Sequence, residues 1–252
     1  MKKILQCFSV LSLVVGLLSA CTTAIAPSDA YRDETAHQIY QKGKTALQDK
    51  NFSEAIKRFE ALDVQYPFGV ETEQAQYYLI YAYYMKEDYV LSASAAERFI
   101  RLHPANPHVD YAYYLRALSE YYQNMGILER MFSADLATRD LTQIEKSYRD
   151  FSLLVARFPN SAYRPAAHQY MIYLRNILAN HELEVAQFYY RHKAYVAAAN
   201  RASNVVAYYE GAPAVKPALI LMAKAYRQLR MDKLLQDTLR VINDNYPDEV
   251  VS

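Results

Sequence analysis

The stretch IYQKGKTALQDKNFSEAIKRFEALDVQYP, residues 39–67, decides the fold of this chain. It contains two helical patterns separated by a short polar break and closed by a proline. The small residues Gly43 and Ala55 would let the two helices approach closely, while Phe59 and Leu62 would fill the seam with the next pair of helices. The stretch therefore predicts a tightly packed helical hairpin that needs a neighbour to cover its apolar face.

The closing dipeptide recurs along the chain, with an aromatic residue or histidine before proline each time. Proline ends a helix and favours an extended residue before it, so each dipeptide marks the end of one hairpin. Phe52 and Tyr89 open second helices, each fifteen residues before a closing proline. This self-similarity resembles that of tetratricopeptide (TPR) repeats. The four closures are Tyr66-Pro67, His103-Pro104, Phe158-Pro159 and Tyr246-Pro247.

The repeats predict an all-α fold, a right-handed superhelix of about five TPR-type hairpins. Such an array has an extended concave surface that suits a partner's peptide segment. Five glycines in the whole chain are few for a fold built on tight β-turns. The ten expected helices span about 31–49, 53–66, 71–86, 89–103, 108–124, 141–158, 163–191, 195–209, 214–229 and 232–246.

We divide the array into two parts. Residues 31–160 hold the first three units, with a long loop at 125–140 where the helical period breaks, and residues 161–252 hold the last two units. A long loop in a helical array is often functional, although a spacer is equally compatible with this composition.

The first residues have the composition of a secretory signal. Lys2 and Lys3 form a basic head, and the apolar run 4–18 is too short for a retained membrane helix. The tetrapeptide Leu18-Ser19-Ala20-Cys21 resembles the lipobox of bacterial lipoproteins, in which the cysteine is acylated and becomes the first mature residue. We therefore expect residues 1–20 to be removed and residues 21–30 to form a lipidated tether.

An alternative is a plain signal cleaved at the small residues 24–26. Under the lipoprotein interpretation, acyl chains on Cys21 would hold the mature domain on a bilayer surface without spanning it. Thr22, which follows the cysteine, resembles the residue found in lipoproteins sorted to the outer membrane.

Composition and motifs argue against several classes of function. The 28 Lys and Arg stand against 27 Asp and Glu, and loss of Lys2 and Lys3 leaves a mature charge of about −1, which gives no electrostatic footprint for nucleic acid. With Cys7 in the signal and Cys21 lipidated, we expect no disulfide. The six histidines lack metal-ligand spacing, and no nucleophile elbow or phosphate loop occurs. We expect neither an enzyme nor a bound cofactor or metal.

A stripe of tyrosines is the main candidate binding feature. Tyr77, Tyr81 and Tyr84 recur at spacings of four and three, so they share one face of a helix. Tyr40 in the first unit and Tyr113 in the third are expected on the corresponding face. Together they predict an aromatic groove for a peptide segment, because tyrosine combines an apolar body with a polar tip. The alternative is that these tyrosines belong to the core.

The run 97–116 carries a more specific signal, since it resembles the BamD family, lipoproteins of the outer-membrane β-barrel assembly (BAM) machine. The resemblance covers essentially the whole mature chain, with one departure at 210–213, where an aromatic residue before proline would be expected. Further matches lie at 139–140, 150–161, 185–190 and 200–201.

The resemblance implies a non-enzymatic subunit anchored at the periplasmic face of the outer membrane. Members of that family bind BamA, through its POTRA domains, with their C-terminal repeats, so Arg201, Lys224 and Arg227 are the expected BamA-binding residues. The N-terminal repeats are associated with unfolded barrel precursors and with BamC, and BamE is a further expected partner. The tyrosine stripe is then the expected precursor-binding groove.

Two alternatives from other classes remain. A generic TPR lipoprotein that scaffolds cell-envelope enzymes would share the anchor and the hairpins, but it would not bind BamA. A lytic transglycosylase would need a separate catalytic lobe, and helices assigned to about residue 246 leave no room for one.

Overall fold

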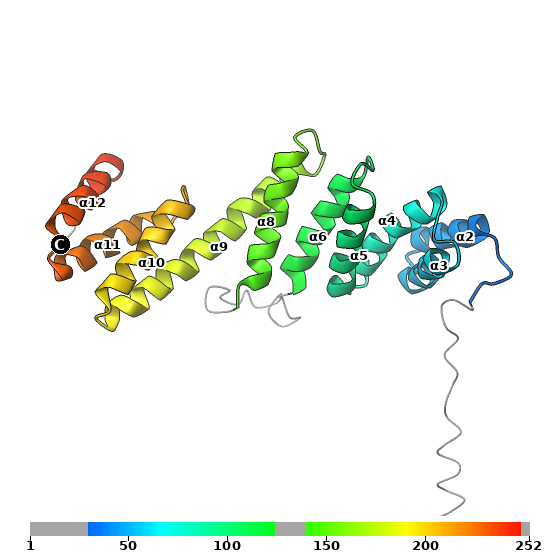
Figure 1. Cartoon of the computed structure of the whole chain (residues 1–252), viewed down its shortest axis with the longest axis horizontal. Coiled ribbons are helices and arrows are strands. Elements are labelled where there is room, and N and C mark those ends of the chain that lie inside the picture. Colours follow the sequence, from blue (N-terminus) through cyan, green and yellow to red (C-terminus); the bar gives the residue numbers. More distant parts are fainter. Residues whose placement is uncertain (1–29, 124–139, 248–252) are drawn as a thin grey trace, which may run out of the picture.

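The computed structural model describes residues 30–123 and 140–247, and every regular element in those ranges is an α-helix. The helices stack side by side along one axis, with the first hairpin at one end and the last at the other (Figure 1). The all-α array of TPR-like hairpins is confirmed. The ten described helices are α2 (Ala36–Gln48), α3 (Phe52–Gln65), α4 (Val70–Met85), α5 (Tyr89–Leu102), α6 (Val109–Gln123), α8 (Thr142–Arg157), α9 (Arg164–Arg191), α10 (Tyr195–Tyr208), α11 (Val215–Leu229) and α12 (Asp232–Asn245).

The first helix begins later than the sequence pattern predicted, at Ala36 instead of about residue 31. Thr35 accepts a hydrogen bond from the Gln38 backbone N–H at 3.3 Å, and the Gln38 side chain accepts one from the Thr35 N–H at 2.9 Å. This reciprocal capping box fixes the start of α2. Tyr31, where the helix was expected to begin, has a positive φ of 67°, which lies outside the right-handed helical region.

Close helix packing at Gly43 sets the geometry of the first hairpin. A Cβ added there would lie 2.6 Å from Cε1 of the Phe59 ring, which is fully buried. Glycine therefore brings α2 against α3 at a distance that no larger residue permits without movement of the ring. This confirms the close approach expected from the sequence.

Two later hairpins use a serine hydroxyl at an equivalent contact. Ser92 on α5 donates to the Ile80 carbonyl at 3.0 Å, and Ser147 on α8 donates to the Ala117 carbonyl at 2.8 Å. Both serines are fully buried, so their hydroxyls need these partners. The repeated bond makes Ile80 and Ala117 equivalent positions of successive first helices.

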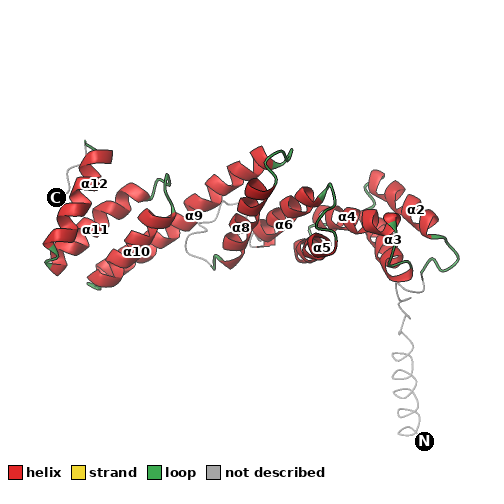
Figure 2. Ribbon diagram, turned by 45° about the horizontal axis from the view of Figure 1, so that its top comes forward, coloured by secondary structure: helices red, strands yellow, loops and turns green. Residues whose placement is uncertain are grey.

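Helix α9 links the two ends of the array (Figure 2). Its first half, up to Leu178, packs into the apolar cluster that runs from α4 to α8, whereas Ala179 and the residues after it pack with α10 and α11. Tyr209 contacts both clusters. The two apolar cores therefore meet within one continuous helix of 28 residues.

The turn at 210–213, which lacks the expected aromatic residue, is held by Arg175 of α9. Its guanidinium donates to the carbonyl of Glu210 at 2.8 Å and to that of Gly211 at 3.0 Å. Gly211 adopts a positive φ of 74°, which glycine tolerates without strain. The aromatic residue of this closure is Tyr209, which caps the C-terminal end of α10 as Tyr66 caps α3 and Phe158 caps α8, but it is not followed directly by proline.

Several features predicted from the sequence lie outside the described residues. They are the signal at 1–20, the lipidated Cys21 with most of its tether, and nearly all of the loop at 125–140. Within the described ranges, no helix combines the length and apolar character needed to cross a membrane.

Candidate functional site

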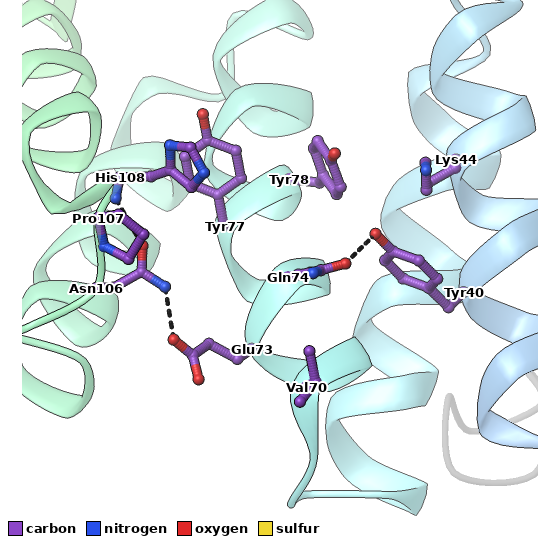
Figure 3. A pocket seen from close by; sticks show the side chains of 10 residues that line it. All are labelled: Tyr40, Lys44, Val70, Glu73, Gln74, Tyr77, Tyr78, Asn106, Pro107 and His108. Atoms are coloured by element: carbon purple, nitrogen blue, oxygen red, sulfur yellow. Dashed lines mark hydrogen bonds between the residues drawn. The ribbon is translucent and has the colours of Figure 1, made fainter.

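A pocket of about 330 Å³ opens between the first two hairpins (Figure 3). Its walls come from α2, from the first half of α4 and from the loop between α5 and α6. The lining residues are Tyr40, Lys44, Val70, Glu73, Gln74, Tyr77, Tyr78, Asn106, Pro107 and His108. Two of the five predicted groove tyrosines, Tyr40 and Tyr77, therefore lie in one pocket.

Tyr40 forms the α2 wall of the pocket. Its hydroxyl donates to the Gln74 side chain on α4, and its ring lies 6.4 Å from the Tyr78 ring. The Lys44 ammonium lies 5.5 Å from the centre of the same ring, within cation–π range. The pocket thus carries a cation beside an aromatic wall.

Tyr77 forms the opposite wall together with the α5–α6 loop. Its ring centre lies 5.2 Å from that of His108 and 5.4 Å from that of Tyr78. The loop is fixed by Asn106, which donates to Glu73 at 2.5 Å and accepts a hydrogen bond from the His108 backbone at 2.7 Å. Rigid aromatic walls of this kind suit binding of an apolar or aromatic side chain.

Both wall tyrosines are neutral phenols at physiological pH. Burial, reinforced by the neighbouring Tyr78 hydroxyl, raises the pKa of Tyr40 to about 12. Burial also raises the pKa of Tyr77 to about 12, with Tyr163 as the next contribution. The hydroxyls therefore serve as hydrogen-bond donors and acceptors across the working pH range.

Tyr81 and Tyr84 continue the same face of α4 beyond the pocket. Tyr81 packs edge-on against Phe52 with ring centres 6.2 Å apart, and Tyr84 packs against Tyr89 at 5.7 Å and Tyr122 at 6.2 Å. Both side chains are half-buried. Part of each therefore packs in the core, and part remains exposed along the predicted groove.

Tyr113 does not share this face, and its expected placement on the groove is wrong. The side chain is buried in the seam with α8, where its ring lies 5.5 Å from Phe158 and its hydroxyl accepts a hydrogen bond from Arg157 at 2.9 Å. Because Ala117 is equivalent to Ile80, the counterpart of Tyr77 is the next residue, Tyr114.

The equivalent position in each of the first three hairpins is a tyrosine, with Tyr114 in the place expected for Tyr113. The spacing from Tyr40 to Tyr77 and from Tyr77 to Tyr114 is thirty-seven residues, and this period could have been found in the sequence. Tyr114 stacks on Tyr163 at 5.0 Å, so the aromatic contacts continue to the start of α9. Sequence reasoning also missed Gln74 and Tyr78 on α4. It missed Asn106 and His108 as well, because the spacing of α4 gives no signal for what the loop brings to it.

The predicted cationic residues lie at the other end of the array. Arg201 on α10 pairs with Glu182 of α9 at 2.8 Å and keeps almost half of its side chain exposed. Lys224 and Arg227 lie one turn apart on α11, with Lys224 half-buried and Arg227 exposed. The two candidate surfaces are thus separated by the length of the superhelix (Figure 1).

In the part of the chain that the structure describes, no three or more His, Cys, Asp or Glu side chains are placed to hold a metal ion. The arrangement offers aromatic walls, hydrogen-bonding groups and one cation. Such a site can bind a peptide segment.

Stacked helical hairpins of this kind define the TPR-like class of repeat proteins. The family model described as "Outer membrane lipoprotein" (YfiO) matches residues 32–241, and the chain belongs to this family. Membership associates the chain with the outer membrane.

Curated relatives agree along nearly the full length. The chain is 36% identical to "Outer membrane protein assembly factor BamD" of Neisseria gonorrhoeae over 251 residues, which cover 98% of this chain and 92% of the relative. It is 35% identical to the protein of the same name in Vibrio cholerae, over 92% of this chain and 95% of that one. The resemblance to the BamD family is confirmed.

Proposed function

We propose that the chain is a non-enzymatic lipoprotein subunit of the outer-membrane protein assembly machine, held at the periplasmic face by lipid on Cys21. The relatives' shared description as assembly factors supports this role. The pocket between α2 and α4 is the observation that carries it, because its aromatic walls and hydrogen-bonding groups suit a peptide segment.

The pocket holds an extended segment of an unfolded barrel precursor. Tyr40 and Tyr77 provide walls for an aromatic side chain of that segment, and Lys44 attracts a carboxylate, such as the one at a chain terminus. Tyr81 and Tyr84 extend the contact along α4. Tyr113 supports this surface from within the third hairpin.

Binding of a barrel-precursor C-terminal peptide tests this site. Tyr77→Ala is expected to weaken peptide affinity at least tenfold, whereas the matched control Tyr208→Ala, on exposed α10 surface, leaves it unchanged. Lys44→Gln, which is less disruptive to packing, should weaken binding of the free carboxylate more than that of an amidated peptide. If all variants bind the peptide with equal affinity and keep their helical content by circular dichroism, the pocket is not the precursor-binding site.

The C-terminal hairpins bind BamA. Arg201, Lys224 and Arg227 place positive charge at that end, and we propose that they meet an acidic patch on the POTRA domains. Paired charges across an interface mainly set association rate and specificity, so binding should weaken with salt.

Charge reversal tests this interface. Lys224→Glu with Arg227→Glu should reduce co-purification of BamA, while the control Arg240→Glu on α12, whose side chain is 73% exposed, should not. Retention of BamA by the double variant would exclude these residues from the interface.

Affinity purification of the lipidated protein separates the remaining alternatives. Recovery of BamA with BamC and BamE supports membership of the complex. Recovery of cell-wall enzymes without an integral barrel protein would instead support a generic envelope scaffold.

A further inference from the structure

Three large apolar side chains are exposed at the turn between α3 and α4. Val64 is 57% exposed, Phe68 92% and Val70 73%, and the value for Phe68 is the highest among the large apolar side chains of the described residues. A fully solvated phenylalanine at a turn is unfavourable in water, so a group of three indicates a surface that is covered in use.

Hydrogen bonds fix the backbone of the turn, although Phe68 at its tip is exposed to solvent. Thr72 donates to the Tyr66 carbonyl at 2.5 Å, and the Gly69 carbonyl accepts from the Glu73 N–H at 3.1 Å. Nothing lies within 4 Å of the position that a Cβ of Gly69 would occupy. Phe68 therefore projects from a fixed turn into open space.

The chain enters the fold beside this turn. The Gln65 side chain donates to the Ala30 carbonyl, and the Tyr66 hydroxyl donates to the Glu34 carbonyl at 3.0 Å. Only eight residues separate Ala30 from Cys21, so even a fully extended tether would span about 30 Å. A bilayer that accepts the lipid on Cys21 is therefore within reach of the turn.

The carboxylates near the turn have polar partners: Glu71 and Glu73, which follow Val70 on α4, lie 2.8 Å from His37 and 3.6 Å from His103, respectively. Asp63 is paired with Arg98 at 2.5 Å, and Glu34 is paired with Lys42 at 3.0 Å. The Asp63 and Glu34 carboxylates thus carry their own counter-charges, which reduces repulsion from anionic headgroups.

We propose that Val64, Phe68 and Val70 form an apolar foot that inserts into the interface of the bilayer to which the lipid is anchored. This inference rests on the lipidation in the proposed function. The lipid supplies attachment, and the tether keeps the foot at high effective concentration near the membrane, so that a weak second contact suffices. Two contacts fix the orientation of the array, which a single lipidated tether leaves free.

The apolar foot adjoins the pocket that Tyr40 and Tyr77 line. Val70 belongs to both the foot and the pocket lining, as Figure 3 shows at the pocket's lower edge. An inserted foot thus holds the pocket at the membrane surface, where a barrel precursor would be received.

A single fluorophore reports on the foot. The two native cysteines are Cys7, in the signal, and Cys21, so Phe68→Cys introduces one free thiol into the full lipidated chain. An environment-sensitive label at this thiol, in phosphatidylethanolamine–phosphatidylglycerol vesicles, should shift to the blue and be quenched by a lipid-borne quencher. The matched label from Tyr208→Cys, at a side chain that is 75% exposed on α10, should do neither.

The outcomes are separable. Mass spectrometry first establishes the lipid on Cys21; its absence would overturn the proposed anchoring itself. With the lipid present, a label at 68 that stays as hydrated as the label at 208 overturns the foot. A blue shift that appears only when BamA is added also overturns it, because the label is then covered by protein and not by lipid. In a second readout, Phe68→Glu should at least halve the quenching of a label introduced by Val64→Cys, and unchanged quenching would contradict insertion.

Discussion

Arg116 holds Asp150 through two parallel hydrogen bonds, of 2.5 and 2.7 Å, between α6 and α8. Both side chains are largely buried, and the pair links the two helices of the third hairpin. Bidentate geometry of this kind offsets much of the cost of burying two charges. The pair thus fixes α6 against α8 within the third hairpin.

Arg116→Met should destabilise the protein by about 3–5 kcal/mol, because it leaves the Asp150 carboxylate buried without its partner. Urea denaturation followed by circular dichroism measures the loss. The double variant Arg116→Met with Asp150→Leu should recover much of it, since no buried charge then remains. A double variant as unstable as the single one would contradict this explanation.

Glu120 gives the third hairpin a pH dependence. Burial, followed by the neighbouring Asp150, raises the pKa of Glu120 to about 8 from its ordinary value of 4.5. Between these two pH values the folded state binds more protons than the unfolded state, so stability falls as pH rises through this window.

Glu120→Gln should therefore remove part of that decline. The glutamine keeps a donor beside Asp150 but cannot ionise, so the melting temperature of the variant should exceed that of the parent at pH 8.5 and match it near pH 5. The same difference in melting temperature between the two proteins at both pH values would show that folding does not raise the pKa of Glu120.

Gly43→Ala should destabilise the first hairpin by about 1–3 kcal/mol, even though alanine is the better helix former. The added methyl would lie 2.6 Å from the Phe59 ring, which is fully buried and cannot swing into solvent. Thermal unfolding measures the effect, with Gln41→Ala, at an exposed position of α2, as the control. Adding Phe59→Leu to Gly43→Ala should restore part of the loss; if it does not, the clash is not the cause.

The helices were predictable because their period and their closing prolines are local features of the chain. The register of the third hairpin is also present in the sequence, in the thirty-seven-residue spacing of Tyr40, Tyr77 and Tyr114, but counting back from Pro159 across the insertion before α8 does not give it. Placing Tyr113 on the groove was off by one residue, and one residue turns a helical side chain by about 100°. The pocket also depends on His108, which a loop brings to Tyr77 and which no pattern within α4 could indicate.

Two buried serines of neighbouring hairpins, Ser92 and Ser119, should be energetically coupled. Ser119 donates to Ser92 at 2.9 Å, and Ser92 donates to the Ile80 carbonyl, so one chain of hydrogen bonds joins α4, α5 and α6. Ser92→Ala should cost about 1–2 kcal/mol because it leaves the Ser119 hydroxyl buried without its acceptor. Adding Ser119→Ala removes that orphaned group, so the double variant should be less destabilised than the sum of the two single variants. Urea denaturation of all four proteins measures the coupling, and strictly additive losses would show that the two hydroxyls act independently.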